Sequence, residues 1–443
     1  MTDTALLAIA IVAGLYMAWN IGANDVANAM GTSVGSGALT LKRAIVLAAV
    51  FEFCGAYFVG GGVAQTIRKG IIDLDAFRGA TAVPAAAPGP AGPQAELRTP
   101  PPDQAARDLG RKLAMGMLAS LLAAALWLNI ATFFGQPVST THAIVGAVVG
   151  FAVAAAGPAT VVWSKMGEIA ASWIISPICG GLLAYIVYRC IKRCVLDSDD
   201  PVFMARRALP LCFALVVCIL SVSVLYKVLH MPLRRVLWQA LPIALVMGLL
   251  AAAISHQVIR RAARNPRYGA APHYEIVERW FARIQPVTAC YMAFAHGAND
   301  VANAIGPLAG VIHFLQGGAV GDQTPVPAWL LAIGGAAIVV GLATYGYKVM
   351  EAVGKKITEI TPTRGFAAEF GTASTVLVCS MLGLPVSTTF VLVGAVMGVG
   401  IARGFAALDT RVIRRIFASW LITIPVSAIM AAAIFRVFLW LSG

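Results

Sequence analysis

Long runs of apolar residues, separated by short polar segments, recur along almost the whole chain. Each run has about the 20 residues that a helix needs to cross the hydrocarbon core of a bilayer. This pattern predicts an all-α integral membrane protein. The runs lie near residues 5–22, 44–64, 169–188, 208–226, 236–255, 284–306, 328–347 and 416–441.

Two further apolar stretches are divided by a proline-containing motif and predict a different element. Residues 370–402 contain no Asp, Glu, Lys or Arg over 33 positions, and Pro-Val-Ser-Thr-Thr at 385–389 leaves 15 residues before it and 13 after it. Neither half can cross about 30 Å at about 1.5 Å per residue, so we predict a re-entrant helical hairpin. The matching stretch, 113–164, has 52 charge-free residues, and its length alone would allow two full crossings.

An internal duplication favours a hairpin there too. The segment that ends in Gly-Ala-Asn-Asp-Val-Ala-Asn-Ala occurs at 16–29 and again 275 positions later, and Gly-x-Pro-Val-Ser-Thr-Thr at 135–141 returns 248 positions later. Five crossings precede the second copy, so it enters the membrane from the opposite side, an inverted-topology arrangement typical of transporters. The predicted parts are repeat one (1–190), a linking region with two transmembrane helices and basic loops (191–283), and repeat two (284–443).

The two offsets differ by 27 residues, so repeat one carries an extra segment between its two motifs. An Ala- and Pro-rich stretch at 79–106 accounts for it. This composition disfavours a packed helix and predicts a solvent-exposed loop insertion.

Composition agrees with a membrane location. Hydrophobic residues make up 59% of the chain and charged residues only 12%, whereas soluble domains usually carry about 25% charged residues. The net charge of +13 resides mainly in short loops between apolar runs, so it indicates membrane topology and not nucleic-acid binding. We expect no enzyme activity and no cofactor, because no nucleophile–base pair or metal-ligand cluster stands out in the sequence.

Loop charge also predicts the orientation in the membrane. Basic residues favour the cytoplasmic side. Residues 307–327 lack Lys and Arg and are predicted to lie outside, whereas the basic loops 189–207, 256–283 and 348–366 are predicted to be cytoplasmic; the basic segments 227–235 and 65–112 oppose this assignment.

The duplicated acidic motif places a carboxylate and amides within apolar surroundings. Asp25 and Asn28, like Asp300 and Asn303, are three residues apart and share one face if the segment is helical. Intramembrane acids usually face a cavity or an ion path, and this density of oxygen ligands suits a hard cation such as Na⁺. The alternative is an aspartate that caps a helix broken at the preceding glycine.

The duplicated hydroxyl motif predicts an anion site. A proline at a helix start leaves the following backbone N–H groups without partners, and they carry the positive end of the helix dipole. Capping by a serine or threonine explains one hydroxyl in each hairpin but not three in succession. The two triads are Ser139, Thr140 and Thr141, and Ser387, Thr388 and Thr389.

Two other acids, Glu52 and Glu369, lie within apolar segments. Each is either a coupling ligand or proton site, or a structural acid satisfied by its neighbours. His142 and His296 have no histidine at the matching position of the other repeat, so we expect both to be packing or hydrogen-bonding residues outside the core site.

The paired Gly-Ala-Asn-Asp-Val-Ala-Asn-Ala and Pro-Val-Ser-Thr-Thr motifs closely resemble those of the inorganic phosphate transporter (PiT) family. The resemblance covers roughly 15–65, 112–188 and 284–441. It implies uptake of inorganic phosphate coupled to Na⁺ or H⁺. By position, phosphate would contact both hydroxyl triads together with Asp25 and Asp300; the coupling cation would contact Asp25, Asn28, Asp300, Asn303, Glu52 and Glu369, and any Na⁺ the two acid–amide pairs.

The expected partners are inorganic phosphate, a coupling cation and the lipid bilayer of a plasma membrane, the inner membrane in a bacterium. A homodimer fits a transporter in which one part moves against a scaffold. Three alternatives stay open: a sulfate permease with the same architecture, an uncoupled channel, and a receptor.

Overall fold

The computed structural model describes residues 2–81, 102–133, 138–228, 236–263, 272–316, 325–346, 361–404 and 410–442. Within these residues the chain is helical apart from turns and one isolated β-bridge between Ile72 and Val161. Seven helical segments of the described chain are long and apolar enough to cross a membrane. The prediction of an all-α integral membrane protein is therefore confirmed.

Repeat one begins with two helices in succession, which join at Asp25. The helices of this repeat are α1 (Asp3–Asn24), α2 (Val26–Gly35), α3 (Leu41–Val59), α4 (Gly61–Gln65), η1 (Thr66–Gly70), α5 (Leu74–Thr81), α6 (Pro102–Phe133), α7 (Thr140–Ala156), η3 (Pro158–Thr160) and α8 (Trp163–Ile191).

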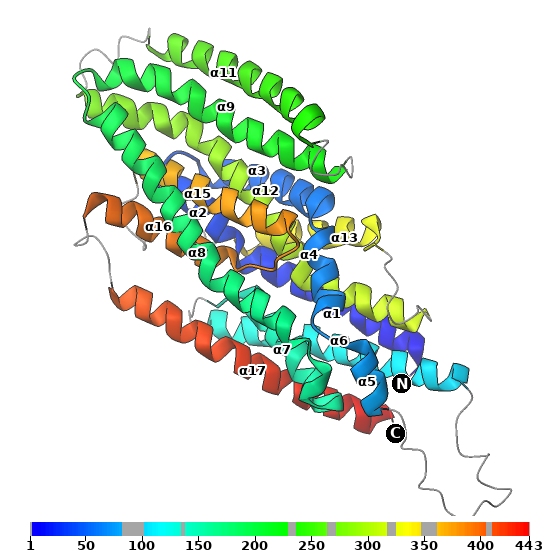
Figure 1. The fold of residues 1–443 in the computed structure, drawn as a ribbon. Helices are drawn as coiled ribbons and strands as arrows, with labels where there is room; N and C mark the ends of the chain where they lie inside the picture. The colour runs from blue at the N-terminus through cyan, green and yellow to red at the C-terminus, as the bar shows by residue number, and fades with distance from the viewer. Residues whose placement is uncertain are drawn as a thin grey trace, which may run out of the picture.

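The linking region supplies η4 (Lys192–Leu196), α9 (Pro201–Val228), η5 (Val236–Ala240) and α11 (Leu241–Ala263). Repeat two contains α12 (His273–Leu315), α13 (Ala328–Gly341), η7 (Leu342–Gly346), α15 (Pro362–Met381), α16 (Thr388–Arg403) and α17 (Thr410–Ser442). Helices α9 and α11 pack on each other at one edge of the bundle, and α17 lies at the opposite edge (Figure 1).

The two predicted hairpins differ in their first helix. Helices α7 and α16, which follow the hydroxyl motifs, have 17 and 16 residues and are shorter than a bilayer crossing requires. Helix α15 has 20 residues. Helix α6 has 32 residues, 28 of which form a candidate membrane span. The charge-free run of α6 begins at Leu113 and is long enough to cross, a feature that the comparison with repeat two did not predict.

The two ends of the predicted loop insertion are helical. Residues 79–81 belong to α5 and residues 102–106 to α6, so helix occupies both margins of the 79–106 segment. Residues 82–101 of that insertion lie outside the described residues.

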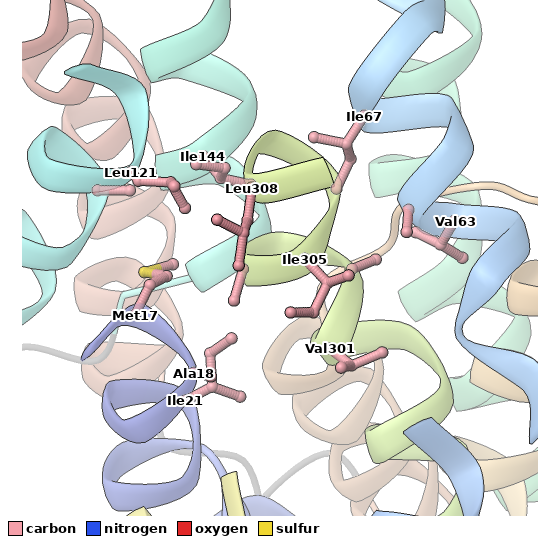
Figure 2. Packing of buried hydrophobic residues seen from close by; sticks show 14 of the residues in the cluster. Met17, Ala18, Ile21, Val63, Ile67, Leu121, Ile144, Val301, Ile305 and Leu308 are labelled. Atoms are coloured by element: carbon pink, nitrogen blue, oxygen red, sulfur yellow. The ribbon is translucent and has the colours of Figure 1, made fainter. Parts of the chain in front are cut away.

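Helix α12 runs through the middle of the bundle and is buried along most of its length. Ile305 and Leu308 of α12 lie between Val63 and Ile67 on one side and residues of α1, α6 and α7 on the other (Figure 2). Large apolar side chains on α11, such as Leu249 and Ile254, are by contrast exposed, as lipid-facing residues are. The polar motif of α12 is therefore held in the most enclosed part of the molecule.

Glycines at matching positions of the repeats make matching contacts with the opposite repeat. Gly22 lies against the backbone of α13 at Ile338, and its counterpart Gly297 lies against the backbone of α3 at Glu52. A Cβ atom at either glycine would overlap a backbone carbonyl of the facing helix.

Matching glycines of the two hairpins also contact helices of the opposite repeat. Gly146 of α7 lies against Ile424 of α17, and its counterpart Gly394 of α16 lies against Pro177 of α8. Partners that are exchanged in this way are what two halves related by a two-fold axis would show, as in an isologous dimer. The direction in which each repeat crosses the membrane stays a prediction.

Candidate functional site

The hydroxyl triads lie at the N-termini of the short hairpin helices. Ser139 is the N-cap of α7 and accepts a hydrogen bond from His142 N at 3.2 Å, and Ser387 caps α16 in the same way through Phe390 N at 3.4 Å. Each serine thus serves as the ordinary cap, which leaves the two threonines after it for other partners. Thr140, Thr141 and Thr388 are almost fully buried.

The acid–amide motifs reach these helix starts from both repeats. Asn28 donates to Thr389 Oγ1 at 2.8 Å, and Asn303 donates to Thr140 and Thr141, each at 3.2 Å. Each asparagine therefore contacts the triad of the opposite repeat. These contacts join residues that are 361 positions apart in the first case and 162 or 163 in the second.

Each aspartate interacts with the triad of its own repeat. Thr388 donates to Asp300 Oδ2 at 3.0 Å, and the Thr140 hydroxyl interacts with the Asp25 carboxylate. The local backbone differs between the repeats, because the helix is interrupted at Asp25 whereas α12 continues through Asp300. The sequence alternative of a capping aspartate is therefore met only in part: the helix is interrupted in the first motif, at Asp25 and not at Gly22, and the Asp25 side chain makes no capping hydrogen bond.

A histidine that the sequence analysis left out of the core site joins two of the predicted acids. His296 Nε2 lies 2.7 Å from Asp300 Oδ2, and its Nδ1 lies 2.8 Å from Glu52 Oε1. All three side chains are fully buried. The missed signal was the spacing of four residues between His296 and Asp300, which places both on one helix face. His142 packs instead against the rings of Trp173 and Phe390.

The centre of this cluster contains oxygen atoms that no hydrogen-bond donor of the described residues reaches. Ligand atoms of Asp25, His296 and Asp300 lie within 4.8 Å of one another, a geometry that could hold a metal ion. Asp25 Oδ2 and Asn303 Oδ1 are buried and accept no hydrogen bond from the described residues. Buried acceptors without donors are costly unless a cation or water satisfies them, so the residues fit a hard cation such as Na⁺.

Glu369 belongs to a separate buried cluster. Its carboxylate accepts hydrogen bonds from Ser33 at 2.7 Å and from Gln285 at 3.1 Å, and also from Thr32 and Thr288. Four donors around one carboxylate are what a satisfied structural acid needs, and three of them are hydroxyls, which can turn their lone pairs to a cation instead. Among the described residues, the hydrogen bonds of Glu369 do not reach Asp25 or Asp300.

A cavity of about 580 Å³ opens beside the first acidic motif. Asn24, the residue before Asp25, lines it and donates to Thr132 Oγ1 at 3.0 Å. Asn129 donates to Asn20 Oδ1 at 2.8 Å in the same wall. The wall includes Trp19, Asn20, Asn24, Asn129, Thr132 and Tyr345. The asparagine and threonine side chains lie near the C-terminal ends of α1 and α6, and polar residues within membrane-spanning helices usually face a cavity or an ion path.

A helical membrane fold with short helices whose N-termini meet paired acidic motifs defines a membrane transporter. The chain belongs to the phosphate transporter family, whose model matches residues 21–431. It is 43% identical over 437 residues to a putative phosphate permease of Pyrococcus abyssi, covering 99% of this chain and 98% of that protein.

Two other similarities point the same way. The chain is 44% identical over 454 residues to the chloroplastic inorganic phosphate transporter 2-1 of Arabidopsis thaliana, covering 97% of this chain and 71% of that protein. It is also similar to a solved structure titled the sodium-dependent phosphate transporter, with a TM-score of 0.84, 37% identity, and coverage of 98% of this chain and 99% of that one. The family is one of transporters and not of enzymes.

Proposed function

We propose that this protein is a secondary active transporter that carries inorganic phosphate together with Na⁺ by alternating access, in the inner membrane if the host is a bacterium. The observation that carries the proposal is the meeting of both acid–amide motifs with both hydroxyl triads. Phosphate would lie at the N-termini of α7 and α16, within reach of Thr140, Thr141, Thr388 and Thr389, with Ser139 and Ser387 holding the helix starts. The sodium-dependent transporter of similar structure favours Na⁺ over H⁺ as the coupling ion.

Charge balance explains why the two ions would move together. The hydroxyls and helix N-termini are neutral donors, and the carboxylates of Asp25 and Asp300 repel an anion. A cation at the unpaired oxygens of Asp25 and Asn303 would offset that repulsion. Each ion thus makes burial of the other less costly, which is the physical basis of coupling.

Alternating access is supported by the exchanged contacts of the repeats. Two-fold related halves can take up each other's conformation, which moves the opening from one side of the membrane to the other. A channel would need no such exchange. A homodimer remains a further expectation from the scaffold-and-mover architecture.

Phosphate is distinguished from sulfate by its proton. A protonated phosphate oxygen can donate to a carboxylate, and Asp25 Oδ2, which has no donor among the described residues, can accept it beside a bound cation because a carboxylate oxygen has two lone pairs. Sulfate carries no proton near neutral pH and would leave that carboxylate facing bare oxygens. The site therefore favours phosphate over sulfate, which otherwise has the same shape and charge.

Uptake by proteoliposomes tests the proposal. With separate inward Na⁺ and H⁺ gradients, we expect labelled phosphate to accumulate with the Na⁺ gradient and excess sulfate to leave the rate unchanged. Accumulation with the H⁺ gradient alone would assign a different coupling ion. Accumulation of labelled sulfate would move the protein to the sulfate alternative, and equilibration without accumulation would indicate a channel.

The role of Glu369 is tested by its amide. The variant Glu369→Gln keeps the side-chain size but removes the charge and places an NH₂ group opposite hydroxyl donors. If Glu369 contributes to a Na⁺ site, the Na⁺ concentration for half-maximal uptake should rise at least about tenfold. The exposed Glu168→Gln is the matched control. An unchanged Na⁺ dependence with a lower melting temperature would make Glu369 a structural acid.

A further inference from the structure

The first asparagine of each acidic motif makes different contacts in the two repeats. Asn299 is fully buried and binds the backbone of Val386, which it contacts through Nδ2 to the carbonyl oxygen at 2.6 Å and through Oδ1 to the N–H at 3.4 Å. Its counterpart Asn24 is half-buried, lines the 580 Å³ cavity and donates to Thr132. One asparagine thus binds a hairpin tip, whereas the other faces an opening.

Each repeat contains both kinds of partner. The repeat-one counterpart of Val386 is Val138, and the repeat-two counterpart of Thr132 is Ser380. Ser380 is buried and donates to Val376 O within its own helix, so its oxygen remains able to accept a hydrogen bond. The difference between Asn24 and Asn299 is therefore one of conformation and not of available partners.

The glycine contacts are exchanged between the repeats, whereas the acidic motifs differ, because a helix ends at Asn24 and continues through Asn299. This difference occurs beside the cavity. Both asparagines lie next to the acids of the site, at positions 24–25 and 299–300. A change of partner at either asparagine would therefore alter the position of Asp25 or Asp300.

We propose that Asn24 and Asn299 are reciprocal gating residues. In the state described, Asn299 holds the tip of the repeat-two hairpin and closes its side of the site, while Asn24 is turned to Thr132 and its side is open. In the opposite state Asn24 binds the Val138 backbone and Asn299 turns to Ser380. This inference rests on the alternating access proposed above and names the residues that perform it.

A buried amide makes such a gate two-state. If the fully buried Asn299 left the backbone of the hairpin tip without a new partner, donors and acceptors would be unpaired, which is costly inside a protein. The hydroxyl of Thr132 or Ser380 supplies that second partner. Two discrete hydrogen-bonded positions, with no favourable position between them, are what a bistable gating element requires.

Cysteine labelling tests the gate. The reporter is Ile130→Cys, because Ile130 lines the cavity and is 43% exposed. The parent protein for all variants carries this reporter together with Cys179→Ser, Cys190→Ser and Cys194→Ser, which remove the exposed cysteines. The probe is a membrane-impermeant methanethiosulfonate, applied to right-side-out and inside-out vesicles. In the predicted orientation the cavity opens to the cytoplasm, because Tyr345 in its wall precedes the basic loop 348–366.

The two asparagines should act in opposite directions. Asn24→Ala removes the contact that would close the cavity, and Asn299→Ala removes the contact that holds the other side closed. We expect the reporter to be labelled at least about fivefold faster in Asn24→Ala than in Asn299→Ala. Equal rates, or a faster rate in Asn299→Ala, would overturn the proposal. Asn299→Ser replaces Asn299→Ala if the alanine variant does not fold.

Asn20→Ala is the control, since Asn20 lines the same cavity and its repeat-two counterpart is Ala295. Its labelling rate should stay within about twofold of the parent, because it removes a polar contact of similar size outside the gate. A change as large as that of Asn299→Ala would overturn the proposal. Phosphate uptake by the parent is measured in parallel: divergent labelling rates without any uptake would reject the proposed function and leave the gate.

Discussion

Asp300→Asn is expected to lower the initial rate of phosphate uptake by about 100-fold or more. The carboxylate accepts hydrogen bonds from Thr388 and Asn299 and lies 2.7 Å from His296. An amide in its place presents an NH₂ group to some of these donors and removes the negative charge that a cation would balance. Initial rates in proteoliposomes at saturating Na⁺ and phosphate measure the loss.

Glu275→Gln is the matched control for this change. It also turns a carboxylate of α12 into an amide, but Glu275 is exposed and pairs with Arg279 at the surface. Exposed ion pairs contribute little, so its uptake rate should stay within about twofold of the unaltered protein. If Asp300→Asn transports at the unaltered rate, the charge of Asp300 has no part in transport and the proposed cation site is wrong.

Gly22→Ala is expected to have the largest effect on stability. The added methyl group would overlap the carbonyl of Ile338 on α13, so the two helices must move apart where they are most closely packed. Overpacking against backbone costs up to about 3 kcal/mol, because a backbone carbonyl cannot rotate away as a side chain can. Thermal unfolding of the purified protein should show a clearly lower midpoint.

Gly61→Ala provides the comparison. A methyl group there meets only Leu331 Cδ1 at 3.7 Å, an ordinary contact, and the gain in helix propensity is similar at both positions. We expect its unfolding midpoint to be unchanged or slightly higher. Equal midpoints for Gly22→Ala and Gly61→Ala would contradict the close approach of α1 and α13.

The duplication made much of the site predictable. A single Asn-Asp pair in an apolar run has many explanations, but the same motif twice, each with a Ser-Thr-Thr triad, indicated one site built from both repeats. The structure accordingly joins Asn28 to Thr389 and Asn303 to Thr140. The roles of these residues in binding stay predictions.

The features without a repeat counterpart were the ones that the sequence did not reveal. His296 was set aside because Ile21 occupies its place in repeat one, although it lies between Glu52 and Asp300 in the fold. The length of α6 was underestimated for the same reason, since repeat two was the guide. Partners such as Glu52 for His296, 244 residues apart, depend on helix packing that periodicity alone does not specify.

Each hydroxyl triad is contacted by an asparagine from the other half of the chain, so one repeat alone carries only half of every such contact. A single-repeat ancestor could have assembled this site only as a pair of copies. Fusion of the two copies would then have allowed them to diverge, and His296 and Asn20 are differences of this kind. Residues that occur in one repeat only, such as His296, are thus changes that a symmetric pair of identical chains could not have acquired.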